Sequence, residues 1–356
     1  MSRTGHPTRP HPVRPAGYTV LRAGGGTFLL HRRAAAVAVV LTLLLAAACV
    51  GYLCVGESFV SPADVVDVVL GRPSPDELVV GELRMPRLVL GLLVGAAFGV
   101  AGALVQTVAR NPLASPDVIG VTHGAGAVTV AAMTFGLTSY TALPYVAIAG
   151  GLGAAALVYA FAWRKGMHAS RFVLIGIGFS VALASLTQLF LTKGDYLVAQ
   201  QAKVWLTGSL NGRGYEQAGP LALVMLLLLP CVVWAARAQR TVSFDDDTAT
   251  SLGVRLDRVR LGLVVIGVLL ASVATGAAGP VDFVALLAPQ IARRLTRTAQ
   301  IPLLCSALAG ALIVVVADLL ARRLLAPTEL PVGVLTAAVG APYLMWLIRS
   351  RSGGTS

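Results

Sequence analysis

LRMPRLVLGLLVGAAFG, residues 83–99, places two arginines at the start of a long apolar run. Such a run is typical of a helix that begins at a membrane surface, because about 20 mostly apolar residues are needed to cross the hydrocarbon core. The rest of the chain has the same character: of 356 residues, 56% are hydrophobic and 12% are charged, and the mean hydropathy is +0.79. A soluble core cannot hide that much apolar surface. The composition predicts an all-α integral membrane protein.

Apolar stretches of membrane-spanning length recur along the chain. Nine of them lie at about 34–55, 86–108, 118–136, 142–163, 172–192, 218–236, 260–278, 302–321 and 331–348. A tenth, 281–292, is short and contains Pro289, so hydropathy alone would make it a re-entrant piece or a short buried helix. Counting it, we predict about ten transmembrane helices.

The positions of arginine and lysine decide the orientation and the status of the short segment. Cytoplasmic loops are enriched in these residues. If ten segments cross from a cytoplasmic N-terminus, most basic residues fall inside, including the cluster Arg293, Arg294 and Arg297. Without the short crossing, that cluster would move outside. We therefore predict ten crossings in the cell membrane with both termini cytoplasmic, which places Arg84 and Arg87 on the outer face.

The two ends of the chain read as tails around one transmembrane domain. Residues 1–33 contain arginines but no acidic residue, with prolines and three consecutive glycines, which favours a disordered basic cytoplasmic tail. This tail carries half of the formal net charge of +12, so the charge does not indicate a nucleic-acid partner. We assign residues 34–350 to the transmembrane domain and 351–356 to a short cytoplasmic tail.

The predicted spans carry little titratable chemistry. Asp318 is the one carboxylate well inside a span, with Arg322 four residues later as a possible partner, and Asp282 lies at a helix entrance. His123 reads as a packed or pore-lining residue. An ion-driven transporter normally shows paired acids or histidines near mid-membrane. A secondary transporter is therefore the less favoured alternative.

Sequence motifs for catalysis and cofactors are missing as well. The chain has no GxxxxGK[ST] phosphate-binding loop, no HExxH and no GxSxG, and its four cysteines stand singly. We expect no catalytic residue, no metal site and no cofactor on this chain, which argues against an integral membrane enzyme. Small residues do recur, and Gly95, Gly99 and Gly102 predict close helix packing.

The outer arginines admit two readings. Arg84 and Arg87 could anchor a helix end by reaching toward lipid headgroups. Alternatively, together with Arg322 and Arg323 near the end of the ninth span, they could form a docking surface for an acidic partner.

The order of motifs is more specific than any single one. They are RMPR (84–87), GAAFGVAGALVQTVARNPLASPDVIGVTHGA (95–125), WLTGSL (205–210), SLGV (251–254), GPVDFVALLAPQIARRL (279–295), ADLLAR (317–322) and ELPVGVLTAAVGAPYLMWLI (329–348). Together they closely resemble the permease subunits of bacterial ABC importers for iron-siderophores and vitamin B12, from about residue 57 to 349. The resemblance implies the ten-helix type II importer fold, with a ferric siderophore favoured as cargo and vitamin B12 or heme as alternatives.

The resemblance also implies partners and sites. A substrate-binding protein outside would dock on Arg84, Arg87 and Arg322. A pair of cytoplasmic ATPase subunits, which hold ATP and Mg, would receive a coupling loop at 243–258. A second permease chain would complete the transport path, and NPLASPDV and WLTGSLNGRGYE favour a heterodimer over a homodimer.

The coupling loop has its own sequence signals. Its predicted contact residues are Asp245, Asp246, Ala249, Leu252 and Gly253. The aspartates favour the N-terminus of a short helix and Leu252-Gly253 its end. The family usually has Gly-Glu where this chain has Asp245-Asp246.

Overall fold

The structure is a computed structural model that describes residues 18–23, 26–56, 58–163, 169–242 and 246–352. Helices occupy all ten predicted spans: α1 (Arg32–Cys54), α3 (Met85–Ala109), α4 (Val121–Thr134), α5 (Leu143–Ala162), α6 (Ala169–Lys193), α8 (Tyr215–Val242), α10 (Leu256–Ala278), α11 (Val284–Thr296), α12 (Leu303–Arg323) and α13 (Val332–Ser352). Three short helices lie between them: α2 (Pro62–Val69), α7 (Tyr196–Leu206) and α9 (Asp246–Ser251). The all-helical membrane fold predicted from the sequence is confirmed.

The helices differ in whether each can cross a bilayer by itself. Within the described residues, seven are long and apolar enough to do so. The 14 residues of α4 and the 13 of α11 reach only about 20 Å at 1.5 Å per residue, short of a hydrocarbon core of about 30 Å. In both cases the approach to the helix turns through a left-handed residue, Gly120 (φ 87°) or Phe283 (φ 66°). Irregular backbone at membrane depth is tolerated where protein or a water-filled cavity covers it.

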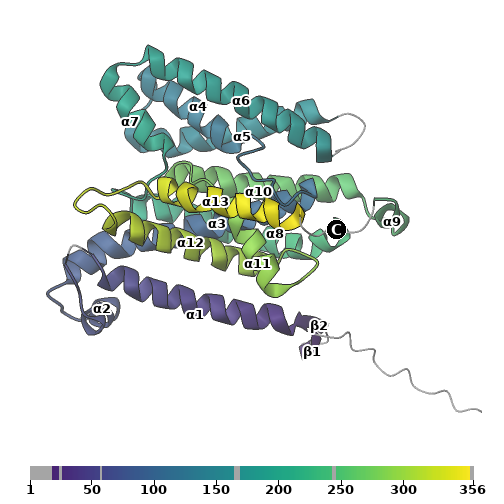
Figure 1. Ribbon diagram of the computed structural model, residues 1–356, viewed down its shortest axis with the longest axis horizontal. Coiled ribbons are helices and arrows are strands. Elements are labelled where there is room, and N and C mark those ends of the chain that lie inside the picture. Colours follow the sequence, from purple (N-terminus) through teal and green to yellow (C-terminus); the bar gives the residue numbers. More distant parts are fainter. Residues whose placement is uncertain (1–17, 24–25, 57, 164–168, 243–245, 353–356) are drawn as a thin grey trace, which may run out of the picture.

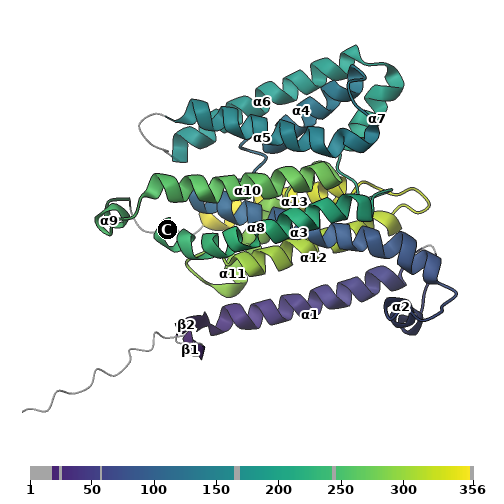
Figure 2. The ribbon, with the colours of Figure 1, turned by 180° about the vertical axis from the view of Figure 1, so that it is seen from behind.

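The helices form two layers with an outlying helix (Figure 1). One layer holds α4, α5, α6 and α7, and the other holds α3, α8 and α10 to α13, with α1 lying along the outside of α12. Figure 2 shows the same separation from behind. The beginning of α1, the helix α9 and the end of α13 lie at one end of the long axis, and α2 lies at the other. We call these the cytoplasmic end and the outer end, following the orientation expected from charge.

Helix α3 is the hub of the larger layer, and its glycines explain how its neighbours come so close. A Cβ placed on Gly95 would lie 2.6 Å from the Ala311 Cα of α12, and one on Gly102 would lie 2.6 Å from the Ala285 carbonyl carbon of α11. Gly99 faces the Ser306 backbone of α12 in the same way. These distances leave no room for any side chain. The prediction that the three glycines serve helix packing agrees with this geometry.

The N-terminal tail is not wholly irregular, which corrects the prediction for residues 1–33. Strands β1 (Tyr18–Ala23) and β2 (Gly26–His31) form an antiparallel hairpin with Tyr18 opposite His31, and α1 begins at Arg32. The sequences YTVLRA and GTFLLH are rich in β-branched and aromatic residues on either side of a glycine pair, a hairpin signal that composition alone hides. Residues 1–17 and 353–356 lie outside the described part.

The second predicted span also starts earlier than expected. A π-helical segment, η1 (Leu78–Arg84), runs directly into α3, with the Met85 N–H donating to the Val80 carbonyl. Pro86 lacks an N–H and disturbs the turn before it. A wider π turn at this point lets the helix continue through the proline.

Candidate functional site

Arg84 does not face open water at the outer end. Its side chain is buried, and its guanidinium donates to the carbonyls of Leu53 (2.6 Å), Cys54 (3.2 Å) and Ser58 (2.6 Å). Leu53 and Cys54 are the last residues of α1, where the helix itself supplies no donor for the carbonyls, and Ser58 lies just beyond. Arg84 therefore ties the end of α1 to the start of α3.

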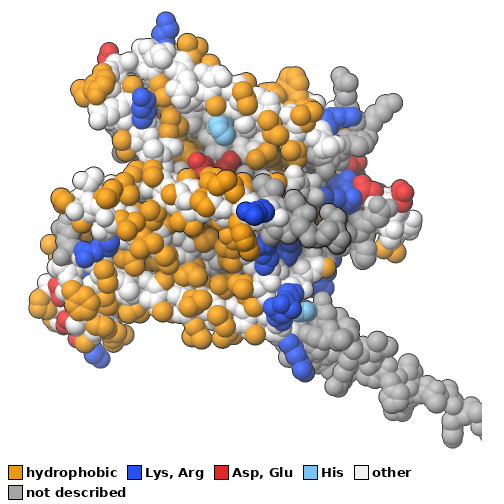
Figure 3. All heavy atoms as spheres, viewed as in Figure 1, with side chains coloured by type: hydrophobic (Ala, Val, Ile, Leu, Met, Phe, Trp, Pro, Cys, Tyr) orange, Lys and Arg blue, Asp and Glu red, His pale blue; other side chains and the backbone are white. Residues whose placement is uncertain are grey.

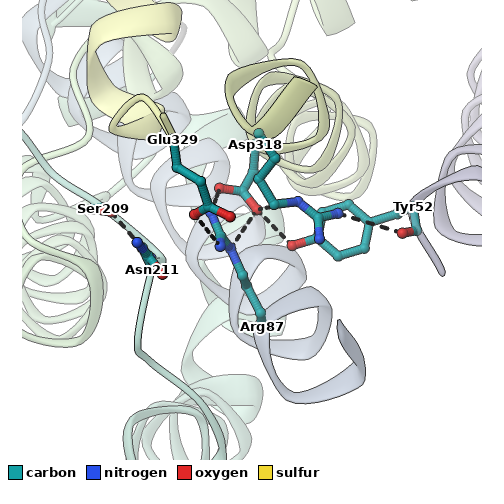
Figure 4. A network of polar contacts seen from close by, with 7 residues as sticks. Tyr52, Arg87, Ser209, Asn211, Asp318 and Glu329 are labelled. Atoms are coloured by element: carbon teal, nitrogen blue, oxygen red, sulfur yellow. Dashed lines mark hydrogen bonds and ion pairs between the residues drawn. The ribbon is translucent and has the colours of Figure 1, made fainter. Parts of the chain in front are cut away.

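Arg87 is buried as well, and it binds two carboxylates (Figure 4). Its Nε and Nη2 donate to the two oxygens of Asp318 at 2.9 and 2.8 Å, and its Nη1 donates to Glu329 at 2.8 Å. The contact with Asp318 is the bidentate arrangement that suits a planar guanidinium. It joins α3 to α12 and to the segment that leads into α13.

Asp318 is fully buried, so its charge requires full compensation. Besides Arg87, the hydroxyl of Tyr52 donates to it at 2.6 Å. Arg322 lies over the Tyr52 ring, 4.0 Å from the centroid, and its Nε is 4.0 Å from the Asp318 carboxylate. The expected pairing within α12 is therefore only a secondary contact, and the main partner of Asp318 comes from α3. We call Tyr52, Arg87, Asp318, Arg322 and Glu329 the outer network.

The outer network borders a pocket of about 610 Å³. Its charged lining residues are Glu82, Arg84, Arg87, Arg213, Arg322, Arg323 and Glu329. The arginines outnumber the carboxylates, so the pocket favours an anionic group. The three docking residues predicted from sequence thus lie together, but in the described residues Arg84 and Arg87 are already bound to other groups of the same chain.

The cytoplasmic end presents α9, the predicted coupling element. Asp246 accepts from Arg110 at the end of α3 (2.6 Å) and from Arg260 in α10 (2.7 Å). The hydrogen bond from Arg260 and the charges of both arginines hold the pKa of Asp246 below its usual range. Asp246 therefore stays ionised and fastens α9 to two transmembrane helices. Asp245, also predicted to contact the ATPase, lies outside the described residues.

The remaining predicted coupling residues differ sharply in exposure. Ala249, on the inner side of α9, is fully buried, whereas Leu252, just after the helix, is 67% exposed. Gly253 ends the helix with φ +77° and donates its N–H to the Thr250 carbonyl at 2.9 Å. This left-handed end suits glycine. It leaves Leu252 as an apolar side chain projecting from the surface.

A polar pocket lies between the two helix layers. Its volume is about 180 Å³, and its lining includes Thr122, His123, Gln188 and Asp282. Figure 3 shows acidic and histidine side chains gathered in the hollow between the layers, on a face that is otherwise mostly apolar. The His123 Nδ1 is buried and, within the described part of the chain, has no hydrogen-bond partner. We call this the interlayer pocket.

Sequence reasoning missed that two carboxylates approach one another beside this pocket. Asp117, from the loop after α3, accepts from Thr122 at 2.7 Å and lies near Asp282. Asp117 also accepts from the Ser115 hydroxyl at 3.3 Å. The two residues are far apart in sequence and lie in loops, so a search for acids within helices could not find the pair. The sequence places Asp282 at a helix entrance but does not identify Asp117 as its neighbour.

Comparison with known proteins identifies the class of this arrangement. The profile of the FecCD transport family matches residues 42–350. The chain belongs to the FecCD transport family. This placement makes it a multi-pass membrane protein and a transport permease, which is a non-catalytic role.

Individual relatives of the FecCD chain extend over most of its length. The ferric enterobactin transport system permease protein FepG of Escherichia coli is 41% identical over 79% of this chain and 85% of its own. The achromobactin transport system permease protein CbrC of Dickeya dadantii is 39% identical over 85% and 88%. A solved inward-facing metal-chelate type ABC transporter matches with a TM-score of 0.76 at 29% identity, covering 89% of this chain and 99% of that one.

Proposed function

We propose that this chain is the membrane permease subunit of an ATP-driven importer that carries a ferric siderophore complex into the cell. The observation that carries the proposal is the FecCD match over residues 42–350, joined to relatives named for ferric enterobactin and achromobactin transport at about 40% identity. The helical arrangement supports it, because it matches that of a solved metal-chelate type ABC transporter over 89% of this chain.

A separate ATPase pair supplies the energy in this proposal. The chain itself has no phosphate-binding loop. Helix α9 offers the contact: Leu252 projects from it, and Asp246 ties it to α3 and α10. An apolar side chain presented on a firmly held helix is suited to fill a groove on a partner.

At the outer end, a substrate-binding protein docks over the arginine-rich pocket, and its acidic side chains approach Arg87 and Arg322. Electrostatic contacts of this kind set orientation and encounter rate more than bulk affinity. Arg84 contributes by fixing the end of α1 beside the pocket.

A second, similar permease chain completes the path, and the interlayer pocket lines it on this chain. The support comes from two polar residues of this pocket, His123, whose Nδ1 has no hydrogen-bond partner among the described residues, and Asp282. Their burial in lipid costs free energy, whereas a hydrated path can solvate them. We favour a non-identical second chain because of the NPLASPDV and WLTGSLNGRGYE segments.

The first test is uptake by cells with and without the chain at limiting iron. Radiolabelled ferric siderophores of the catecholate, hydroxamate and carboxylate classes are compared with labelled cobalamin and heme. We expect loss of one siderophore class with cobalamin and heme uptake unchanged. Loss of cobalamin or heme uptake alone would overturn the siderophore assignment, and unchanged uptake of all cargoes would overturn the importer proposal.

A further inference from the structure

The two carboxylates bound to Arg87 are not equivalent. Asp318 lies in α12, is fully buried and is also held by Tyr52. Glu329 lies in the irregular segment between α12 and α13, keeps 33% of its side chain exposed and uses one oxygen on one guanidinium nitrogen. An exposed, single contact of this kind is weak, whereas a buried bidentate contact is costly to break. Glu329 can therefore leave Arg87 while Asp318 stays.

Glu329 also occupies the face of Arg87 that borders the arginine-rich pocket. In Figure 4 the guanidinium of Arg87 lies between Asp318 and Glu329, with Asn211 on the far side of Glu329. A carboxylate entering the pocket meets Arg87 only where Glu329 now binds, because the other edge is filled by Asp318.

The pocket has unused capacity for such a carboxylate. The Nε of Arg322 is buried and, among the described residues, has no hydrogen-bond partner. The Asp318 carboxylate lies 4.0 Å from this nitrogen, beyond hydrogen-bond distance. Arg322, which lines the pocket, thus keeps one donor that the undocked permease leaves unfilled.

Release of Glu329 would act on the start of α13. Only Leu330 and Pro331 separate Glu329 from this helix. The Leu330 N–H donates to Ala321 (3.1 Å) and the Gly333 N–H donates to Gly208 (3.1 Å), so few bonds besides that of Glu329 hold the junction.

We propose that Glu329 is an internal substitute for a carboxylate of the docking protein, which displaces it from Arg87 and so frees the segment 324–331. This inference rests on the proposed docking function and adds to it the residue that must be exchanged. The docking partner is an acidic protein surface, and its affinity is reduced by competition with Glu329.

The test compares Glu329→Gln with Glu82→Gln in the complete importer reconstituted in nanodiscs. Both residues line the pocket, but within the described residues the Glu82 side chain makes no hydrogen bond or ion pair with Arg87. The probe is the purified substrate-binding protein that supports uptake with this importer, and its dissociation constant is measured. We expect Glu329→Gln to tighten docking about three- to five-fold, the scale of a partly exposed ion pair, and Glu82→Gln to change it by less than about two-fold.

A second readout separates displacement of Glu329 by the docking protein from a general effect of the lost charge. Amide hydrogen exchange of residues 324–331 should rise when the binding protein docks on the wild type and should already be high in undocked Glu329→Gln. The inference would be overturned if Glu329→Gln bound the docking protein no more tightly than the wild type does. It would also be overturned if docking left the amide hydrogen exchange of residues 324–331 unchanged. Either result would leave the importer proposal standing. No docking on the wild type would overturn the docking function and the inference with it.

Discussion

The two ends of this permease carry their charges in opposite ways. At the outer end the buried Arg87 is already bound to both Asp318 and Glu329, so a partner must compete with the existing bond to Glu329. At the cytoplasmic end Asp246 is half exposed and binds α9 to α3 and α10 through Arg110 and Arg260. The Leu252 side chain is exposed on the surface. A partner there adds contacts without breaking any. The comparison indicates that a partner at the outer end replaces an internal ion pair, whereas a partner at the cytoplasmic end forms new contacts and replaces none.

The largest expected effect comes from breaking the buried pair. Asp318→Ala leaves the Arg87 charge buried with only Glu329, and loss of one partner of a buried ion pair costs about 3–5 kcal/mol. We expect a lower midpoint of thermal unfolding in detergent and less protein in the membrane. Replacing both residues, as in Arg87→Met with Asp318→Leu, should recover much of the loss.

The control for that change is an exposed pair at the same end. Arg72 binds Asp67 at 3.1 Å with side chains 66% and 39% exposed. Arg72→Ala should cost less than about 1 kcal/mol. Equal losses for Asp318→Ala and Arg72→Ala would show that burial does not distinguish the two pairs.

At the cytoplasmic end, Gly253→Val should separate ATP hydrolysis from transport. A β-branched residue at φ +77° is strained by about 1–2 kcal/mol, which would distort the end of α9 and move Leu252. We expect ATP hydrolysis by the assembled importer to persist while uptake per ATP falls. Gly71 has φ +69° and the same open surroundings at the outer end, so Gly71→Val is the matched control and should leave coupling intact. Equal uncoupling by both variants would argue against the role of α9.

The smallest effect is expected from an exposed arginine beside the outer pocket. Arg323→Glu should weaken docking by about 0.2–1 kcal/mol, mainly through a slower association rate that depends on salt. The protein level in the membrane should not change. Lys193→Glu, an exposed reversal at the end of α6, is the control. A docking rate that is the same for both variants would remove Arg323 from the docking surface.

Sequence reasoning placed the helices well because their signal is local. Apolar length and arginine position define each span, and even the short α11 followed from the charge cluster beyond it. The family resemblance located α9 and brought Arg84, Arg87 and Arg322 to one pocket. Helix ends were less predictable, because the π turn before Pro86 and the N-terminal hairpin depend on local bonding that composition does not show.

The partners of the charged residues could not be read from the sequence. Asp318 was paired with Arg322 by helical spacing, but its main partner, Arg87, is 231 positions away. For the same reason, a charge reversal at Arg84 plus Arg87, which would be the direct test of docking on these two arginines, would also remove the partner of a buried carboxylate. We expect that variant to lose protein from the membrane, so lost uptake would not report docking alone.

Helix α3 carries a residue of each site at its two ends, Arg87 near the outer end and Arg110 just beyond the other. Its 25 residues span about 37 Å. Near its middle, Gly99 and Gly102 press against neighbouring backbones, which hinders bending there. If α3 moves as a rigid helix that pivots near Gly99 and Gly102, a displacement of its outer end is accompanied by an opposite displacement of its cytoplasmic end.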